Sequence, residues 1–278
     1  MDSAGDIPQE WLSDYDIQVI PVNIHFGERT YFQGVDLTNE DFYQLVEKIG
    51  TIPKTSQPTP QQFETFYRKI ANPGDTIISI HVTSKLSGTY GSAEIAAREL
   101  QDEFNIIAID SGGGSASIGF MCREARELER GGLPLQKILD RLDFIRKKTE
   151  IIFTLDTLNY ARMSGRVKAL QSALASILNV KPIIVLREGF LDMSEKVRTR
   201  GKSIERILEA MKSRIGEQLA NVAVVHARDL EMGQHLLERV KDVLNCKELI
   251  FTELSTGIAA NLGPGTVGIV AYPVFEGK

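Results

Sequence analysis

The sequence is poor in the residues from which small cross-linked or metal-bound domains are built. Its 278 residues include two cysteines, Cys122 and Cys246, and no Cys-x-x-Cys pair. This excludes a disulfide framework, a zinc ribbon and a thioredoxin-type redox site. The four histidines form no His-Glu-x-x-His motif, which excludes the helix of a zinc peptidase.

Long apolar runs and an excess of positive charge are also missing. No run approaches the roughly 18 apolar residues of a membrane span, and the segment Met1 to Asp6 is acidic and polar rather than a signal peptide. Lysine and arginine number 32 against 37 acidic residues, so the net charge is -5. A general nucleic-acid binder needs a basic surface. We therefore expect a cytoplasmic protein without a nucleic-acid partner or a membrane span.

The residues that are present are typical of an α/β protein. In the first half, apolar segments expected as strands (17–26, 76–82 and 105–109) alternate with segments expected as helices (59–70, 90–103 and 116–129). Thr59, Pro60 and Gln62 together form a strong helix start, with a capping box and proline at the first helical position. The repeated order of strand, polar turn and helix predicts a parallel sheet.

The pattern changes after Pro134. A charged helix is expected at 135–148, followed by a strand at 151–154, a helix at 166–178 and a hairpin at 182–193. Further strands are expected at 222–226, 249–252 and 265–274. Hairpins favour an antiparallel sheet. We therefore predict two α/β domains: residues 1–148 with a parallel sheet and residues 149–278 with a mostly antiparallel sheet.

Serine and threonine gather at the expected strand ends. The segment Ser87-Gly88-Thr89 stands where a helix begins, and free N–H groups at a helix start favour an anion. Gly88 lets a ligand approach the backbone closely. Any one of these segments can equally be an ordinary helix cap. The other members of the set are Asp2-Ser3, Thr55-Ser56-Gln57-Pro58, Thr83-Ser84 and Asp110-Ser111.

The order of these motifs along the chain resembles the DegV family of bacterial fatty-acid-binding proteins. The Thr55-Ser56-Gln57-Pro58 and Leu86-Ser87-Gly88-Thr89-Tyr90 segments are the most specific part of the resemblance, which spans almost the whole chain. The other matching segments are Asp2-Ser3-x-x-Asp6-Ile7-Pro8, Asp110-Ser111, Gly165-Arg166, Lys181-Pro182-Ile183, Val197-Arg198-Thr199 and Gly263-Pro264-Gly265.

The resemblance implies that a long-chain fatty acid binds between the two domains. Thr55 and Ser87 match the family residues that hold the carboxylate. It also implies a carrier that is not an enzyme, needs no cofactor or metal, and presents its ligand to an ATP-dependent fatty acid kinase, with Arg198 and Arg200 on the rim that faces this partner. The supporting ligand residues are expected to be Ser56, Gly88, Thr89, Ser111, Asn261, Gly263 and Gly265.

Two departures from the family pattern stand out. The family usually has a short apolar strand before its Asp-Ser motif, whereas this sequence opens on Met1-Asp2-Ser3. We expect an unfilled position in the parallel sheet, a frayed Ser3 and a natural chain slightly longer than 278 residues. The family also often has histidine where this chain has Asn261, which donates a hydrogen bond but does not titrate near neutral pH.

The residues leave an alternative open, an enzyme that acts on a small phosphorylated or carboxylated metabolite at the same strand ends. It lacks a clear general base, because the motif loops contain no histidine and offer only the carboxylates Asp2 and Asp110. A regulatory protein with a vestigial cleft is a third reading. Candidate residues for an acyl tunnel are Leu158, Ile177, Leu178 and Ile183, although each is equally suited to a core.

Overall fold

The computed structural model describes residues 1–167 and 180–274. This part of the chain divides into two compact units. Unit 1 consists of Met1–Asp143 with Ser255–Gly257, and unit 2 of Phe144–Leu254 with the described residues from Ile258 onward. The predicted fold class is confirmed, with a parallel sheet in unit 1 and a mixed, mostly antiparallel sheet in unit 2. The finer boundary at residue 148 stays a prediction.

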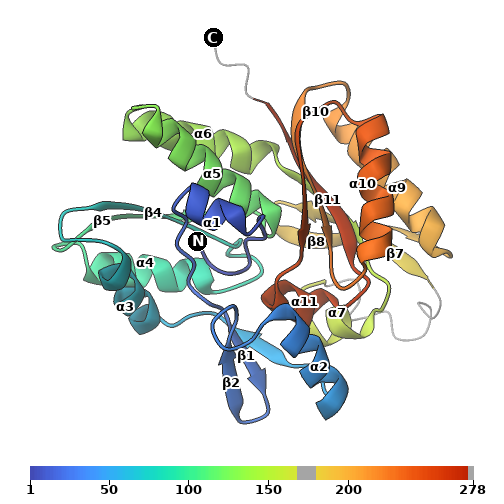
Figure 1. Ribbon diagram of the computed structural model, residues 1–278, viewed down its shortest axis with the longest axis horizontal. Coiled ribbons are helices and arrows are strands. Elements are labelled where there is room, and N and C mark those ends of the chain that lie inside the picture. Colours follow the sequence, from blue (N-terminus) through green and yellow to red (C-terminus); the bar gives the residue numbers. More distant parts are fainter. Residues whose placement is uncertain (168–179, 275–278) are drawn as a thin grey trace. The chain divides into compact units, whose positions relative to one another are not determined.

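The parallel sheet of unit 1 has two described strands, β4 (Thr76–His81) and β5 (Asn105–Asp110). Helix α4 (Thr89–Glu99) packs on both strands and α5 (Ala116–Arg130) packs on β4. Figure 1 shows α3 (Pro60–Ile70) and α4 on one side of the two strands, with α5 and α6 (Leu135–Lys148) on the other.

A second, antiparallel sheet of unit 1 was not predicted. It consists of β1 (Asn23–Phe26), β2 (Arg29–Phe32) and β3 (Lys54–Ser56), in the order β2-β1-β3. The strand expected at 17–26 is wrong in extent, because Ile20 makes only an isolated bridge with Asp2 and the next residue, Pro21, has no N–H to donate. Two further helices, α1 (Glu10–Asp14) and α2 (Asn39–Ile49), complete this unit.

Local sequence signals explain the helix starts of unit 1. The Thr59 hydroxyl accepts a hydrogen bond from the Gln62 N–H, and the Gln62 side chain accepts one from the Thr59 N–H, which confirms the capping box of α3. The apolar face of α3 then packs against α4. The core of this contact is fully buried and consists of Phe63, Tyr67, Ala93, Ala96 and Leu100.

Unit 2 is built on one six-stranded sheet with the order β10-β9-β11-β6-β7-β8. Strands β9 and β10 are parallel and the other neighbours are antiparallel. The predicted hairpin is confirmed as β7 and β8, and the end strand as β11. The helix expected at 166–178 lies outside the described residues from 168 onward. The strands are β6 (Glu150–Thr154), β7 (Lys181–Arg187), β8 (Phe190–Val197), β9 (Ala220–His226), β10 (Cys246–Glu253) and β11 (Val267–Pro273).

Four more helices complete the described part of the chain. Helices α9 (Arg200–Ile215) and α10 (Leu230–Val243) pack against the large sheet, and their buried faces share its apolar core. Helix α7 (Asn159–Ser164) follows β6, and α11 (Thr256–Leu262) begins in the segment that belongs to unit 1. None of the described helices is both long and apolar enough to cross a membrane.

Candidate functional site

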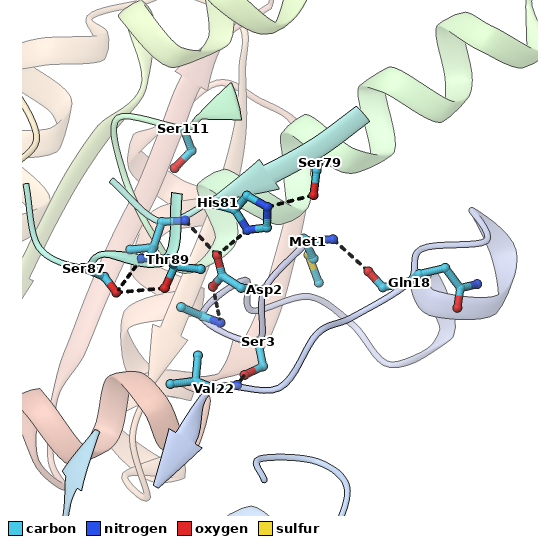
Figure 2. A network of polar contacts seen from close by, with 12 residues as sticks. Met1, Asp2, Ser3, Gln18, Val22, Ser79, His81, Ser87, Thr89 and Ser111 are labelled. Carbon is cyan, nitrogen blue, oxygen red and sulfur yellow. Dashed lines mark hydrogen bonds and ion pairs between the residues drawn. The ribbon is translucent and has the colours of Figure 1, made fainter. Parts of the chain in front are cut away.

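The start of α4 brings together polar atoms of three predicted site residues, Ser87, Gly88 and Thr89. Gly88 is the N-cap residue, and no side chain caps the helix. The hydroxyls of Ser87 and Thr89 lie 2.8 Å apart and point toward each other (Figure 2). Thr89 is fully buried and Ser87 half-buried. The Thr89 N–H donates to the Ser87 oxygen at 3.4 Å. N–H groups at a helix start beside two hydroxyls form an environment that stabilises a carboxylate or phosphate.

Strand β3 brings the Thr55-Ser56 pair into unit 1. Thr55 pairs with Ile24 and Ser56 with Asn23 across the antiparallel ladder. Both residues are half-buried. Sequence reasoning placed this motif in a loop, because a three-residue strand with a lysine and two hydroxyl residues has no hydrophobic alternation to reveal it.

His25 is a site neighbour that sequence reasoning missed. Its Nε2 lies 2.8 Å from the Ser56 hydroxyl, and its Nδ1 lies 2.9 Å from the Thr30 hydroxyl. The motif segments contain no histidine of their own, but His25 reaches one of them from β1. His25 lies beside the Thr-Ser motif because of the register in which β1 pairs with β3. This register would have revealed the contact, but the sequence does not specify it.

Gln57 links the two hydroxyl segments. A Cβ built on Gly88 would lie 2.8 Å from the Gln57 side-chain nitrogen, so this side chain lies directly against the N-cap of α4. The structure thus places Gln57, which follows Thr55 and Ser56, against the Ser87-Gly88-Thr89 segment. Glycine at residue 88 is what allows this approach.

The residues next to this site form a buried polar network (Figure 2). The Asp2 carboxylate lies 3.0 Å from His81 Nδ1 and accepts hydrogen bonds from the N–H groups of Ala4 and Val82. The other ring nitrogen of His81 lies 2.8 Å from the Ser79 hydroxyl. Asp2 and His81 are both fully buried. The network joins the amino-terminal segment to β4, which carries the start of α4.

The charge state of this network follows from its contacts. Burial raises the pKa of Asp2, but the His81 ring and the two backbone N–H groups outweigh it, so the pKa lies below its usual value. Burial lowers the pKa of His81 more than Asp2 raises it. We infer a neutral imidazole beside an ionised carboxylate at neutral pH, a pair that satisfies its hydrogen bonds internally.

Ser3 is ordered rather than frayed, so that expectation is wrong. Ser3 is buried. Its hydroxyl accepts the Val22 N–H at 2.9 Å and donates to the Gln33 side-chain oxygen at 3.1 Å. The same Gln33 side-chain oxygen, Oε1, also accepts the Gly257 N–H at 2.9 Å. The Asp2-Ser3 motif is therefore structural, since it fixes the amino-terminal segment within unit 1.

Asp6, like Asp2, fixes the amino-terminal segment through buried hydrogen bonds, but its pKa is shifted in the opposite direction. It accepts a 2.5 Å hydrogen bond from the Ser115 hydroxyl and a 2.8 Å bond from the Ser255 N–H. Ser115 has a φ of 58°, a conformation that costs a non-glycine residue about 1–3 kcal/mol. Burial, which outweighs these hydrogen bonds, raises the pKa of Asp6 to about 7.

This raised pKa predicts that the stability of unit 1 falls as the pH rises from about 4 to 7. Below the ordinary pKa of 3.8, the folded and unfolded chains both hold the Asp6 proton. Between 3.8 and about 7, only the folded chain holds it, so deprotonation of the unfolded chain opposes folding by up to ~4 kcal/mol. The Asp6→Asn variant keeps a polar atom at each of the two hydrogen-bonding positions but does not titrate. We therefore expect it to remove most of the pH dependence of the unfolding free energy between about pH 4 and 7.

Urea denaturation at intervals between pH 4 and 8 measures the effect. The quantity is the difference in unfolding free energy between the unaltered chain and Asp6→Asn, because other groups titrate equally in both proteins. A difference that stays constant over this range would contradict the assignment.

The remaining predicted site residues of unit 1 serve their own loop. Ser111 is almost fully buried, and its hydroxyl accepts the Gly113 N–H at 3.2 Å. The neighbouring Asp110 accepts the N–H groups of Ser84 and Gly112. These bonds fix the loop after β5. A direct ligand contact of Ser111 stays a prediction.

In unit 2, Arg200 is part of the framework rather than a free cation. Its guanidinium donates to the Asp229 carboxylate at 2.7 Å and to the Gly265 carbonyl oxygen at 2.5 Å. Gly263 and Gly265 have φ values of 87° and 76°, which favour glycine. Arg200 thus fixes this turn against the start of α10. Arg198 is exposed on the same unit, and a role for either arginine toward a partner stays a prediction.

Asn261 and the candidate tunnel residues are described only in part. Asn261 lies near the end of α11 and is half-buried. Ile183 is fully buried in the core of unit 2, and Leu158 is the N-cap of α7. Ile177 and Leu178 lie outside the described residues. Between residues 1–167 and 180–274, no group of three or more His, Cys, Asp or Glu side chains is placed to hold a metal ion.

Comparison with known proteins identifies the class. A family model described as an uncharacterised protein of the DegV family matches residues 1–274. A DegV domain-containing protein of Listeria innocua is 32% identical over 270 residues, which cover 96% of this chain and 95% of the relative. The chain therefore belongs to the DegV family, as its motifs predicted.

Solved structures of the family agree with this fold. A DegV family protein from Thermus thermophilus, described as binding fatty acid, is 30% identical with a TM-score of 0.90, and 98% of each chain is covered. A stearic-acid-binding protein from Eubacterium ventriosum is 26% identical with a TM-score of 0.88, covering 98% of this chain and 96% of its own.

Proposed function

We propose that this protein binds a long-chain fatty acid, with the carboxylate held by Thr55 and Ser87, and presents it to an ATP-dependent fatty acid kinase. The observation that carries the proposal is the uncapped start of α4, where the Ser87 and Thr89 hydroxyls face each other beside the Gln57 side chain. Support also comes from the relatives described as binding fatty acid.

The energetics of a fatty acid suit this division between head and tail. A carboxylate is costly to bury unless it is hydrogen-bonded, and each charge-assisted hydrogen bond contributes about 1.5–3 kcal/mol. Fourteen buried methylenes contribute on the order of 11 kcal/mol before the cost of binding. The headgroup site therefore sets the orientation of the ligand and the tail supplies most of the affinity. That the tail lies between the two domains stays a prediction.

Extraction of the purified protein tests the proposal. We expect native mass spectrometry to show a mass increment that matches a C14–C18 fatty acid, and delipidated protein to bind oleate with a stoichiometry of about one. The absence of a co-purifying fatty acid, together with the absence of saturable binding of palmitate or oleate, would reject the proposed function.

The carrier role predicts that the loaded protein does no chemistry alone. With radiolabelled oleate and ATP, we expect no acyl phosphate until a fatty acid kinase is added. The rival function, an enzyme acting on a small phosphorylated metabolite, has one point in its favour, the contact between His25 and Ser56. Hydrolysis of a phosphoester that ceases in His25→Ala would replace the carrier proposal by this one.

Gly88→Ala is expected to weaken fatty-acid binding about tenfold. The new Cβ would lie 2.8 Å from the Gln57 amide nitrogen, so Gln57 must move across the headgroup site. The φ of Gly88 is -78°, which alanine adopts freely, so we expect the free energy of unfolding to change by no more than ~1 kcal/mol. Isothermal titration with oleate measures the affinity.

Gly91→Ala provides the matched control. Gly91 lies one turn further along α4, and nothing lies within 4 Å of a Cβ built on it. We expect its affinity for oleate to equal that of the unaltered chain. Equal affinities of Gly88→Ala and Gly91→Ala would place the headgroup away from the start of α4.

A further inference from the structure

The three-stranded sheet of unit 1 has a polar face that is distinct from the face that carries Thr55. Successive residues of a strand point to opposite faces of a sheet. Thr55 pairs with Ile24, which is fully buried, so Thr55 lies on the face of this apolar residue. Ser56 and His25 lie on the other face, because each is one residue further along its strand. The hydroxyls of Thr55 and Ser56 therefore point to opposite faces.

Ser56 and His25 form a pair of nucleophile and base on this polar face. The Ser56 hydroxyl lies 2.8 Å from His25 Nε2 and accepts a hydrogen bond from the Asn23 side-chain amide at 3.3 Å. Because Asn23 already donates to this oxygen, the proton of Ser56 belongs in the hydrogen bond with Nε2. A serine that donates its proton to an imidazole nitrogen is the arrangement found in activated serines.

Thr30 orients the ring of His25. Its hydroxyl lies 2.9 Å from His25 Nδ1, so a ring proton on Nδ1 has an acceptor and Nε2 is left as the basic nitrogen. Thr30 opposes His25 in the ladder between β1 and β2, which holds the two side chains next to each other. A third group that orients the base completes the arrangement of an activated nucleophile, here with a hydroxyl in the place of a carboxylate.

The pair is accessible to small molecules and has a positive charge beside it. Ser56 and His25 are half-buried, while Thr30 and Lys54 are exposed. Lys54 opposes His25 in the ladder between β1 and β3, so it lies on the same face. Its ammonium makes no ion pair with any residue in 1–167 or 180–274. A free ammonium beside the nucleophile favours a reactant whose leaving group is an anion such as phosphate.

We propose that Ser56 is an acyl-acceptor site that reacts with small acyl phosphates from solution. The Ser56 oxygen attacks the carbonyl carbon of the acyl phosphate while His25 Nε2 takes up the serine proton. The bond between this carbon and the phosphate oxygen then breaks. The proton passes from His25 to the phosphate, which leaves as hydrogen phosphate beside Lys54. Ser56 ends as an acyl ester and His25 as a neutral ring. This reaction does not rest on the proposed function, because it needs neither Thr55 nor Ser87.

A fluorophosphonate probe and acetyl phosphate test the proposal on the unaltered full chain. The fluorophosphonate labels an activated serine whatever its natural reactant is. We expect it to label Ser56 about 100-fold faster than Ser84, which is an exposed serine of unit 1. We expect acetyl phosphate to place one acetyl group on Ser56 with the same preference over Ser84. Peptide mass spectrometry over a time course gives the rate at each serine.

Variants separate the roles of the neighbouring side chains. His25→Gln removes the base and is expected to slow both reactions at Ser56 about 100-fold. Thr30→Val removes the orienting hydroxyl and is expected to slow them about tenfold, whereas Thr30→Ser restores the rate. Lys54→Gln is expected to slow the reaction with acetyl phosphate about fivefold and to leave the reaction with the uncharged fluorophosphonate unchanged. Urea denaturation followed by Trp11 fluorescence shows that each variant is folded.

Three results would overturn this proposal without touching the proposed function. They are a Ser56 that reacts no faster than Ser84, a rate at Ser56 that His25→Gln leaves unchanged, and a Ser56 that reacts with the fluorophosphonate but not with acetyl phosphate. Oleate binding is measured separately, by calorimetry on protein that has met neither reagent. Its absence would reject the proposed function and leave the reactivity of Ser56 standing.

Discussion

The double variant Thr55→Ala with Ser87→Ala is expected to bind oleate about 100-fold more weakly than the unaltered chain. Each hydroxyl supplies one charge-assisted hydrogen bond to the carboxylate in the proposed site, worth about 1.5 kcal/mol at the lower end, and 1.4 kcal/mol is a factor of ten in affinity. We expect each single variant to lose about tenfold. Titration calorimetry with oleate, on delipidated protein, measures the dissociation constants.

Ser84→Ala is the control for this pair. Ser84 lies three residues before Ser87 in the same segment, and its side chain is exposed. Within residues 1–167 and 180–274, its side chain makes no hydrogen bond, and its backbone N–H donates to Asp110. We expect its affinity for oleate to be unchanged. A double variant that keeps an affinity within tenfold of the unaltered chain would reject Thr55 and Ser87 as the headgroup site.

Asp2→Ala is expected to lower the free energy of unfolding of unit 1 by about 3–5 kcal/mol. The change removes a buried carboxylate and leaves His81 and the N–H groups of Ala4 and Val82 without their partner. Buried polar groups that lose a partner each cost about 1–3 kcal/mol, and breaking a buried pair costs more than its formation contributes. Asp2→Asn, which retains an acceptor, is expected to lose less.

Trp11 reports this loss for unit 1 alone. It is the only tryptophan of the sequence and is buried against Phe120, so its fluorescence follows the unfolding of this unit in urea. Asp102→Ala, at an exposed carboxylate of unit 1, is expected to change the free energy by less than ~0.5 kcal/mol. A loss below 1 kcal/mol in Asp2→Ala would show that the network contributes little to stability.

Local features of the fold could be predicted from the sequence. The capping box of Thr59 and Gln62 is confirmed because both its bonds join residues three positions apart. The β7–β8 hairpin is confirmed for the same reason, since its register depends on a short turn. Strand β4 was visible because the β-branched residues Ile77, Ile78 and Ile80 dominate a short segment that begins just after the turn residues Pro73 and Gly74.

Contacts between distant residues could not be predicted. Asp2 and His81 are 79 positions apart, and nothing near either residue specifies the other. The sequence therefore gave no reason to expect an ordered Ser3 or an ionised Asp2. The short strand β3 was missed because Lys54, Thr55 and Ser56 carry no apolar pattern. Its pairing with β1 is what places His25 beside Ser56.

In the candidate site, too, local features could be predicted from the sequence and tertiary contacts could not. The proposed anion-binding role of Ser87, Gly88 and Thr89 rests on residue types at a helix start, and in the described part of the chain no side chain caps this start at its N-cap. Which other side chains approach it depends on tertiary contacts. Gln57 against Gly88 is one such contact. The structural roles of Asp6 and Arg200 are others, since their partners lie 249 and 65 positions away.

The most direct test of the proposed function is a crystal structure of the protein with bound oleate. We predict elongated density whose carboxylate lies within 2.6–3.2 Å of both the Ser87 and Thr55 hydroxyls, at the start of α4. Oleate bound with its carboxylate elsewhere would contradict the assignment of the headgroup site.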